Sequence, residues 1–262
     1  MKAAKKLPLT DECHHWRKIG EVPWDLQKYW QQRHTIFSYY NEGVYMTHDA
    51  WYGVTPEPVA NQIAWELPKT VSDDKTVIID LFAGVGANAI AFALSERWER
   101  VIAIEKDPST LACAQHNAEL YGVSEYITWI NGDNFEYMKL LNSSPSSLED
   151  AIKVDVDKTV LFGSPPWGGP GYSTDEIFDL STMEPYNLAT MHEAYRSMDH
   201  ALFLPRTSDL RQIAQLAPKG TKIEVVQYCV EGASKAMVAY IPGAIQPGGQ
   251  TTAVDPKETE NT

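Results

Sequence analysis

The chain has 262 residues, of which 44% are hydrophobic and 22% are charged, an ordinary composition for a globular protein with a substantial core. Its 22 lysines and arginines face 35 acidic residues, which gives a formal net charge of −13. This charge excludes a protein that coats nucleic acid without sequence preference, because such a protein needs an extended basic face. It does not exclude a partner that is recognised mostly through one nucleotide.

Targeting and redox signals are equally plain. No run of about 20 apolar residues is present, so we expect no transmembrane helix and no membrane partner. The first 15 residues contain lysines without a following apolar run, which is not the pattern of a secretory signal. Cys13, Cys113 and Cys229 lie too far apart for a zinc motif, and their odd number argues against a disulfide framework. A reducing compartment and the absence of a metal site are therefore expected.

The beginning of the chain predicts a helical extension. Residues 1–23 are polar and mixed, and we expect them to be flexible. In residues 24–37 (WDLQKYWQQRHTIF) aromatic and apolar side chains recur at helical spacing, so residues 24–55 are interpreted as a helical N-terminal extension. Thr55, Pro56 and Glu57 then form a helix start, with a capping hydroxyl, a proline at the first position and an acid at the positive end of the dipole.

From residue 77 onward, apolar strands alternate with helical segments. The runs predict strands at 77–82, 101–105, 126–130, 159–163, 200–205, 222–228 and 236–242. Such alternation is typical of an α/β domain with a parallel sheet, here residues 56–242. The last two strands lie too close together for a crossover helix and predict an antiparallel hairpin. Residues 243–262 are rich in Gly, Pro, Thr and charge, and predict a disordered tail.

A glycine-containing loop follows the first predicted strand. Gly84 and Gly86, with Ala89, satisfy the dinucleotide-binding pattern, and Glu105 at the end of the second strand is placed to hold ribose hydroxyls. The pattern alone leaves three interpretations open: a nicotinamide site, a site for S-adenosylmethionine (SAM), or a tight turn with no ligand.

Two further acids favour SAM. Asp80, at the tip of the first strand, would repel a pyrophosphate but would suit the ammonium group of SAM. Asp133, after the third strand, could accept a hydrogen bond from the adenine amino group. Taken singly, such acids are ordinarily solvated; their joint position at successive strand ends, together with Glu105, favours a cationic, amine-bearing cofactor.

The fourth strand ends in a proline-rich motif, Ser164-Pro165-Pro166-Trp167. Two consecutive prolines hold the chain rigid and extended, so the carbonyls of Ser164 and Pro165 can accept hydrogen bonds from an exocyclic amino group. An aromatic residue at the end of the motif stacks on a planar target, and an indole does so most strongly when that target is cationic. The motif follows the (D/N/S)PP(Y/F/W) pattern of enzymes that methylate amino nitrogens.

With these motifs the chain resembles the trimethylguanosine synthase family. The resemblance spans roughly residues 24–242 and is carried by SPPWGGPGY (164–172), DLFAGVGANAIAFAL (80–94), VTPE (54–57), FLPRTSDL (203–210) and KYWQQRHTIFS (28–38). It implies an α/β, Rossmann-like class I SAM-dependent methyltransferase fold with a seven-stranded, mostly parallel sheet. It also implies an enzyme that converts the 7-methylguanosine (m7G) cap of small nuclear and nucleolar RNAs to the 2,2,7-trimethyl form. Two successive SN2 transfers from SAM would release S-adenosylhomocysteine without a metal.

The resemblance further implies roles for single residues. Cofactor binding falls to Phe37, Thr55, Asp80, Gly84, Gly86, Glu105 and Asp133. The catalytic set is Ser164 and Pro165, which orient the guanine N2 amine, and Trp167, which stacks on m7G. Lys28 and Arg206 match positions that reach the cap phosphates. Without the resemblance, Lys28 reads as a solvated helix residue, Phe37 as packing and Thr55 as a helix cap. Trp51 is either a second wall of the base sandwich or a core residue.

Partners, location and rival functions complete these expectations. The family implies capped small RNA as substrate, ribonucleoprotein partners, and residence in the nucleus and nucleolus, and nothing in the sequence demands more than a monomer. One rival is another amino methylase, acting on adenine N6, cytosine N4 or a glutamine amide. The other is a non-catalytic cap-binding module that has kept a methylase fold. Glu105, where many relatives have Asp, is a departure that should still reach a ribose.

Overall fold

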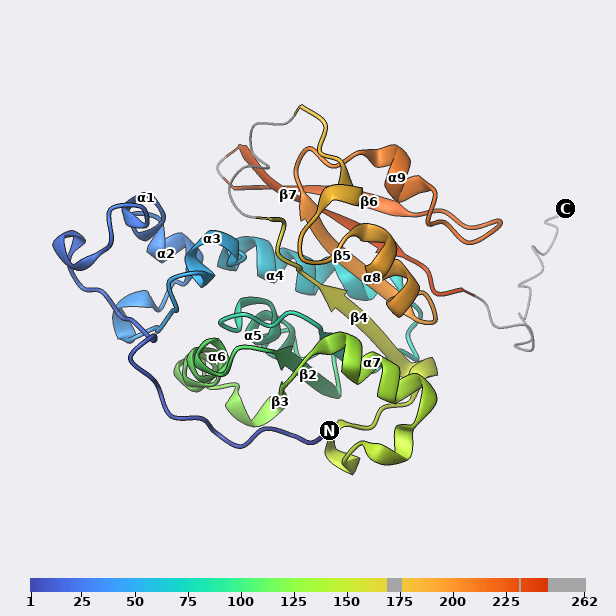
Figure 1. The fold of residues 1–262 in the computed structure, drawn as a ribbon, viewed down its shortest axis with the longest axis horizontal. Coiled ribbons are helices and arrows are strands. Elements are labelled where there is room, and N and C mark those ends of the chain that lie inside the picture. Colours follow the sequence, from blue (N-terminus) through green and yellow to red (C-terminus); the bar gives the residue numbers. More distant parts are fainter. Residues whose placement is uncertain (169–175, 231, 245–262) are drawn as a thin grey trace, which may run out of the picture.

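The computed structural model describes residues 1–168, 176–230 and 232–244, and its centre is a seven-stranded sheet (Figure 1). The strand order is β3-β2-β1-β4-β5-β7-β6. The strands are β1 (Val77–Asp80), β2 (Arg100–Glu105), β3 (Ile127–Asn131), β4 (Thr159–Gly163), β5 (Asp199–Pro205), β6 (Glu224–Val230) and β7 (Ala233–Ile241). The first five are parallel, whereas β7 runs antiparallel to both β5 and β6. This confirms the predicted α/β sheet and its terminal hairpin; most of the predicted tail, residues 245–262, lies outside the described residues.

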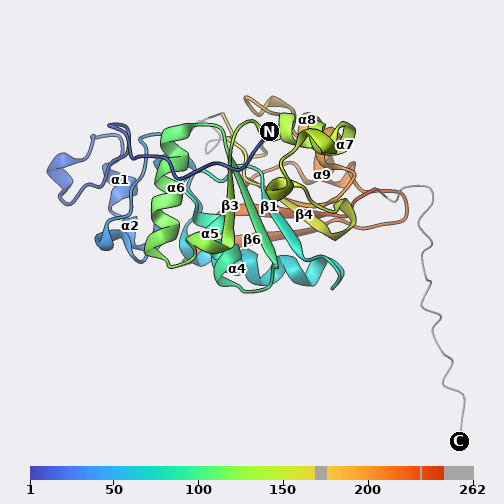
Figure 2. The same cartoon turned by 90° about the horizontal axis from the view of Figure 1, so that it is seen from below.

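Helices cover both faces of the sheet. One face packs α4 (Glu57–Glu66), α5 (Ala87–Leu94) and α6 (Pro108–Leu120), and the other packs α7 (Asn134–Ser143), α8 (Leu188–Tyr195) and α9 (Leu210–Ala214). Figure 2 shows α4 on one side of the sheet and α7, α8 and α9 on the other. Neighbouring strand residues point to opposite faces, so Ile78 joins the first core and Ile79 the second. Among the described residues, no helix has the length and apolar character needed to cross a membrane.

The N-terminal extension is less regular than predicted. The helical spacing of residues 24–37 corresponds to two one-turn helices, α1 (Gln27–Trp30) and α2 (Arg33–Ile36), followed by α3 (Ala50–Gly53). At the break, the indole N–H of Trp30 donates to the carbonyl of Trp16 at 3.0 Å, and the Arg33 guanidinium stacks 3.7 Å from the centre of the Trp30 ring. Tertiary anchoring of Trp30 thus accompanies the turn between these two helices.

The first 16 residues form a strap across the domain rather than the flexible segment that we expected (Figure 1). The Ala4 amide donates to the Trp129 carbonyl at 2.7 Å, and the Leu7 amide donates to the side-chain oxygen of Gln115 at 2.8 Å. Further along, the Thr10 hydroxyl donates to Ser109 at 2.8 Å. The physical reason is that β3 is an edge strand, whose free backbone groups offer partners to a passing segment.

Asn117 of α6 joins the extension to the loop after β1. It is fully buried; its side-chain oxygen accepts from the Tyr45 amide at 2.9 Å, and its amide nitrogen donates to the carbonyls of Tyr45 at 2.9 Å and Val85 at 3.0 Å. One side chain therefore satisfies three backbone groups that belong to two separate segments.

We predict that Asn117→Ala lowers the free energy of unfolding by about 2–4 kcal/mol, because it leaves three buried backbone groups without partners. Urea denaturation followed by circular dichroism would measure the change. Asn61→Ala, at an exposed position of α4, is the matched control and should stay within about 0.5 kcal/mol of wild type. Equal unfolding midpoints for the two variants would contradict the bridging role.

Candidate active site

A cavity of about 530 Å³ opens at the carboxyl ends of β1, β2, β3 and β4, and residues 47–55 of the extension close its other side. The edge of a parallel sheet beyond its strand ends is where open α/β folds bind ligands. Six residues predicted from the sequence line this cavity: Thr55, Gly84, Glu105, Asp133, Ser164 and Pro165. The structure therefore brings together the cofactor motif and the proline motif, which are far apart in sequence.

Glycine is needed at positions 84 and 86 of the loop after β1 for two different structural reasons. Both adopt positive φ, 53° at Gly84 and 95° at Gly86, a region that side chains avoid. A Cβ on Gly86 would also lie 3.3 Å from the Cα and Cβ of Ala114, so this glycine lets α6 approach. Gly84 lines the cavity and its amide donates to Glu105 Oε2 at 2.9 Å; Gly86 does not line it.

Glu105 is held by backbone amides at both carboxylate oxygens. Besides the bond from Gly84, its Oε1 accepts from the Asp107 amide at 2.8 Å. Burial raises its pKa, and the two amide bonds act in the opposite direction by stabilising the anion. Each oxygen keeps a lone pair, so the fixed carboxylate can accept from a pair of ribose hydroxyls.

Asp80 at the end of β1 is completely buried. Its Oδ1 accepts from the Phe82 amide at 3.2 Å, whereas Oδ2 has no hydrogen-bond partner among the described residues. Burial raises the pKa of Asp80 to about 7, and the negative charge of Glu105 adds to the effect. What this oxygen lacks is a positive charge. Asp80 does not itself line the cavity, but the next two residues, Leu81 and Phe82, do. The contact between Asp80 and the ammonium group of SAM, directly or through a water, therefore stays a prediction.

Asp133 follows β3 and caps α7. Its Oδ1 accepts from the Phe135 amide at 2.9 Å, and its Oδ2 lies 3.2 Å from the Lys106 ammonium. Partial burial favours the protonated form, but the hydrogen bonds from Lys106 and the helix amides outweigh it and lower the pKa of Asp133. The side chain is therefore an ionised acceptor at the cavity wall.

The proline motif begins where β4 ends. Ser164 and Pro165 line the cavity, and the Ser164 hydroxyl donates to the Phe82 carbonyl at 3.3 Å. Trp167 lies just beyond the cavity wall, half-buried and stacked on Phe203, with ring centres 5.6 Å apart and planes 20° apart. Its indole N–H donates to the Phe203 carbonyl at 3.2 Å, so the orientation of the ring is fixed.

Comparison with known proteins decides which chemistry this geometry serves. The sequence profile of the family described as RNA cap guanine-N2 methyltransferase matches residues 75–244. Trimethylguanosine synthase of Schizosaccharomyces pombe is 36% identical over 229 residues, 86% of this chain and 90% of that protein. The chain belongs to the RNA cap guanine-N2 methyltransferase family. Trimethylguanosine synthase of Saccharomyces cerevisiae is 33% identical over 198 residues, which are 74% of this chain and 59% of that protein.

Solved structures support the fold of this cap methyltransferase. A crystal structure from Porphyromonas gingivalis, described as that of a methyltransferase, superposes on this chain with a TM-score of 0.57. The two sequences are 15% identical, and the superposition covers 85% of this chain and 51% of the other. A SAM-dependent methyltransferase of Agrobacterium tumefaciens gives 0.50 at 13% identity, over 72% and 63% of the two chains. The protein is a SAM-dependent methyltransferase with the Rossmann-like class I fold, as predicted.

Several predicted site residues of the cap methyltransferase do not line the cavity. Trp51 is a core residue, packed between Trp16 and Tyr40 at ring-centre distances of 5.9 and 5.8 Å, so its packing supports the core alternative over a wall of the base sandwich. Phe37 is also buried, with its ring centre 6.1 Å from that of Tyr121. Lys28 is exposed, and its ammonium lies 4.7 Å over the Tyr29 ring.

Thr55 lines the cavity, but the prediction that its hydroxyl caps the following helix is wrong. Helix α4 begins without a side-chain cap, and the Thr55 hydroxyl instead accepts from the Asn88 amide at 3.0 Å. The other amide atom of Asn88, its buried oxygen, has no partner among the described residues. This pair fastens the extension to α5 at the cavity wall.

Sequence reasoning missed most of the other lining residues, among them the polar and aromatic side chains of Asp49, Asn88, Lys106 and Tyr186. Asn88 lies within the glycine-loop segment 80–94, whereas Asp49, Lys106 and Tyr186 belong to no recognised motif. Lys106 directly follows Glu105, so its place in the sequence could have indicated that it lies at the site. Tyr186 comes from a segment in which the sequence shows neither a motif nor a regular hydrophobic spacing. Its ring lies 5.9 Å from Phe82 and 4.6 Å from Phe135, so it forms an aromatic wall.

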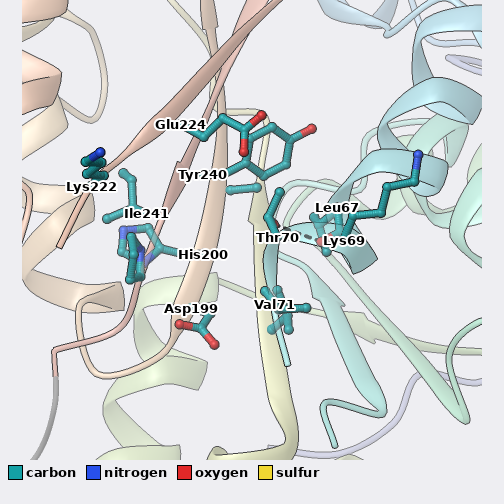
Figure 3. A pocket seen from close by; sticks show the side chains of 13 residues that line it. Leu67, Lys69, Thr70, Val71, Asp199, His200, Lys222, Glu224, Tyr240 and Ile241 are labelled. Atoms are coloured by element: carbon teal, nitrogen blue, oxygen red, sulfur yellow. Dashed lines mark hydrogen bonds between the residues drawn. The ribbon is translucent and has the colours of Figure 1, made fainter. Parts of the chain in front are cut away.

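A second cavity, of about 290 Å³, lies at the opposite edge of the sheet, near the starts of β4 and β5. Figure 3 shows Glu224 beside Tyr240, with Lys69 and Lys222 on opposite sides of the hollow. None of the residues predicted for cofactor or substrate lines it. The chemistry of the family therefore belongs to the cavity at the carboxyl edge.

Asp80 makes cofactor binding depend on pH. Because its pKa is about 7, the carboxyl is largely protonated below pH 7 in the free protein, and a cationic ligand must expel that proton. We expect the Kd for SAM, measured by titration calorimetry, to rise up to about tenfold per unit as pH falls below 7. A Kd that stays constant from pH 7.5 to 5.5 would contradict an ionised Asp80 in the complex.

The variant Asp80→Asn separates binding from stability. Since the folded pKa exceeds the ordinary value of 3.8, ionisation costs stability increasingly from about pH 4 to pH 7, and fully above that. The variant should therefore lose SAM binding yet show a higher Tm than the free wild-type protein at pH 8, with the gain vanishing near pH 4. A lower Tm at pH 8 would show that the charge is compensated within the protein.

Proposed function

We propose that this protein converts the m7G cap of small nuclear and nucleolar RNAs to the 2,2,7-trimethyl form by two successive methyl transfers. The observation that carries the proposal is the position of Trp167, fixed on Phe203 directly after the Ser164 and Pro165 residues that line the cofactor cavity. The trimethylguanosine synthases of the two yeasts, similar over most of this chain, support the same product.

Catalysis rests on orientation. Bound at the carboxyl edge, SAM supplies an activated methyl group, and S-adenosylhomocysteine remains afterwards. Asp80, Glu105 and Asp133 hold the cofactor, while the carbonyls of Ser164 and Pro165 accept from the N2 amine and aim its lone pair. Such alignment contributes up to about 7–11 kcal/mol to lowering a barrier. The methylated nitrogen then loses its proton to water, so no dedicated base is required.

Selectivity for m7G follows from charge. The ring methylated at N7 is cationic, and stacking on an indole gains about 2 kcal/mol when water is excluded. The stack on Phe203 and the bond to its carbonyl hold the indole in place before the substrate arrives, so little ordering cost opposes binding.

Two cations are candidates for binding the cap phosphates. Pro205 pairs with Ala236 across β5 and β7, so Arg206 and Lys235 are the next residues beyond this paired position. Two cations at the end of one strand pair could both attract phosphate. Arg206 was predicted from the resemblance and Lys235 was not. Asp49 at the cavity wall can accept from guanine N1–H.

The deciding experiment is mass spectrometry of an m7G-capped dinucleotide incubated with the protein and SAM, beside an unmethylated cap. One and then two added methyl groups on the m7G cap alone would support the proposal. Methylation of the unmethylated cap, or of uncapped nucleic acid or protein, would favour a general amino methylase. Cap binding without SAM binding would favour a non-catalytic module.

Trp167→Ala should lower kcat/KM for the m7G cap by at least about 30-fold, which corresponds to the ~2 kcal/mol of the cation–π contact. Binding of S-adenosylhomocysteine should stay within about twofold, because Trp167 does not line the cofactor cavity. Trp65→Ala, at an indole 66% exposed on α4, is the matched control and should leave both quantities unchanged. Loss of cofactor binding in Trp167→Ala would show a structural role instead.

The proposed substrates set the remaining expectations. Small nuclear and nucleolar RNAs place the protein in the nucleus and nucleolus, with ribonucleoproteins as partners. A monomer that uses no metal suffices for the reaction as proposed.

A further inference from the structure

One end of the cavity carries an ion pair that stability does not explain. Lys106, the residue after β2, and Asp133, after β3, both line the cavity, with Nζ and Oδ2 3.2 Å apart. Their side chains are 71% and 27% exposed, and pairs this open contribute at most about 1 kcal/mol. The pair nevertheless sits on the wall of the cofactor site, at the ends of two adjacent strands.

In this ion pair the Asp133 carboxylate is held in place by backbone amides, whereas the Lys106 side chain can change its orientation. The Asp133 carboxylate cannot rotate freely, because Oδ1 accepts from the amides of Phe135 and Glu136 at 2.9 and 3.3 Å. Its Oδ2 accepts from Lys106 and still keeps a lone pair, and the Lys106 ammonium keeps two further donors. The cavity wall therefore offers an acceptor and, next to it, a charged donor.

Adenine presents the complementary pattern. Its exocyclic N6 amine is a donor, and the adjacent ring nitrogen N1 is an acceptor. Tyr186, on the same cavity, is held by ring contacts to Phe82 at 5.9 Å and Phe135 at 4.6 Å, and offers an aromatic wall for a planar base. The acceptor Asp133 and the donor Lys106 therefore match the N6 amine and N1 of adenine. They do not match hypoxanthine, which has an acceptor oxygen in place of the amine and a donor N–H at N1.

We propose that Lys106 is a specificity-determining residue of the cofactor site, which donates to adenine N1 while Asp133 accepts from N6. The inference rests on the proposed use of SAM and adds a residue to its recognition. The Lys106 donor makes the site test two atoms of the base at once, because a base lacking either the amine or the N1 acceptor loses one charge-assisted hydrogen bond.

The test compares S-adenosylhomocysteine with its 1-deaza analogue by titration calorimetry, on wild type and on Lys106→Met. The variant keeps the aliphatic stem and removes the donor. Wild type should bind the analogue about tenfold more weakly than S-adenosylhomocysteine, because the analogue loses one charge-assisted hydrogen bond. Lys106→Met should bind both ligands equally, each about tenfold more weakly than wild type binds S-adenosylhomocysteine. Lys106→Arg should restore discrimination.

Lys139→Met, at an exposed position of α7, is the matched control and should behave as wild type. Urea denaturation should give Lys106→Met and wild type the same unfolding midpoint, which excludes a merely structural effect. Undiminished discrimination in Lys106→Met overturns the proposal, as does tighter binding of S-adenosylhomocysteine, which would mean that Lys106 blocks Asp133. Failure of wild type to bind S-adenosylhomocysteine at all would refute the cofactor assignment itself, a distinct result.

Discussion

The proposed cofactor site depends on a buried carboxylate that has no positively charged partner among the described residues. Asp80 ends β1 in the middle of the sheet, with one oxygen on a backbone amide and the other without a partner among the described residues. Such a group is costly in its ionised form unless a cation approaches. The cost acts as a filter: an ammonium group relieves it, whereas a pyrophosphate in the same loop would increase it. The choice between SAM and a nicotinamide dinucleotide thus follows from electrostatics, although the glycine pattern admits both.

The N-terminal extension completes this site because polar contacts fasten it at several points. The Ser38 amide and hydroxyl donate to Glu57 at 2.7 and 2.9 Å, and the Tyr121 hydroxyl donates to the same carboxylate at 2.5 Å. Nearer the cavity, the hydroxyls of Thr47 and Thr110 lie 3.0 Å apart. These bonds join residues distant in sequence and let a segment of one-turn helices form a wall. A movement of the extension would therefore alter the cofactor and substrate sides together.

What the sequence could predict was local. Buried strands, the glycine turn and the proline motif each occupy one short segment, and their placement at one sheet edge follows from parallel topology. Burial of aromatic residues was harder, because a Trp that packs and a Trp that stacks on a base have the same local pattern; Trp51 and Trp167 differ only in what surrounds them. The strap could not be predicted either, because the backbone groups of Ala4 and Trp129 leave no signature in the side chains. Pairs such as Lys106 with Asp133 depend on strand register.

Charge is divided within the active site in a way that reconciles the acidic chain with an RNA substrate. Glu105 and Asp133 line the cavity and Asp80 lies buried next to it, and we assign these acids to a ligand that carries an ammonium and a sulfonium group. In the proposed function the substrate half needs attraction only for one cationic base and a few phosphates, which we assign to Trp167 and Arg206. A net charge of −13 then opposes the binding of extended RNA, because uncompensated phosphates meet an acidic surface. In the proposed function this balance would favour the cap over the body of the transcript.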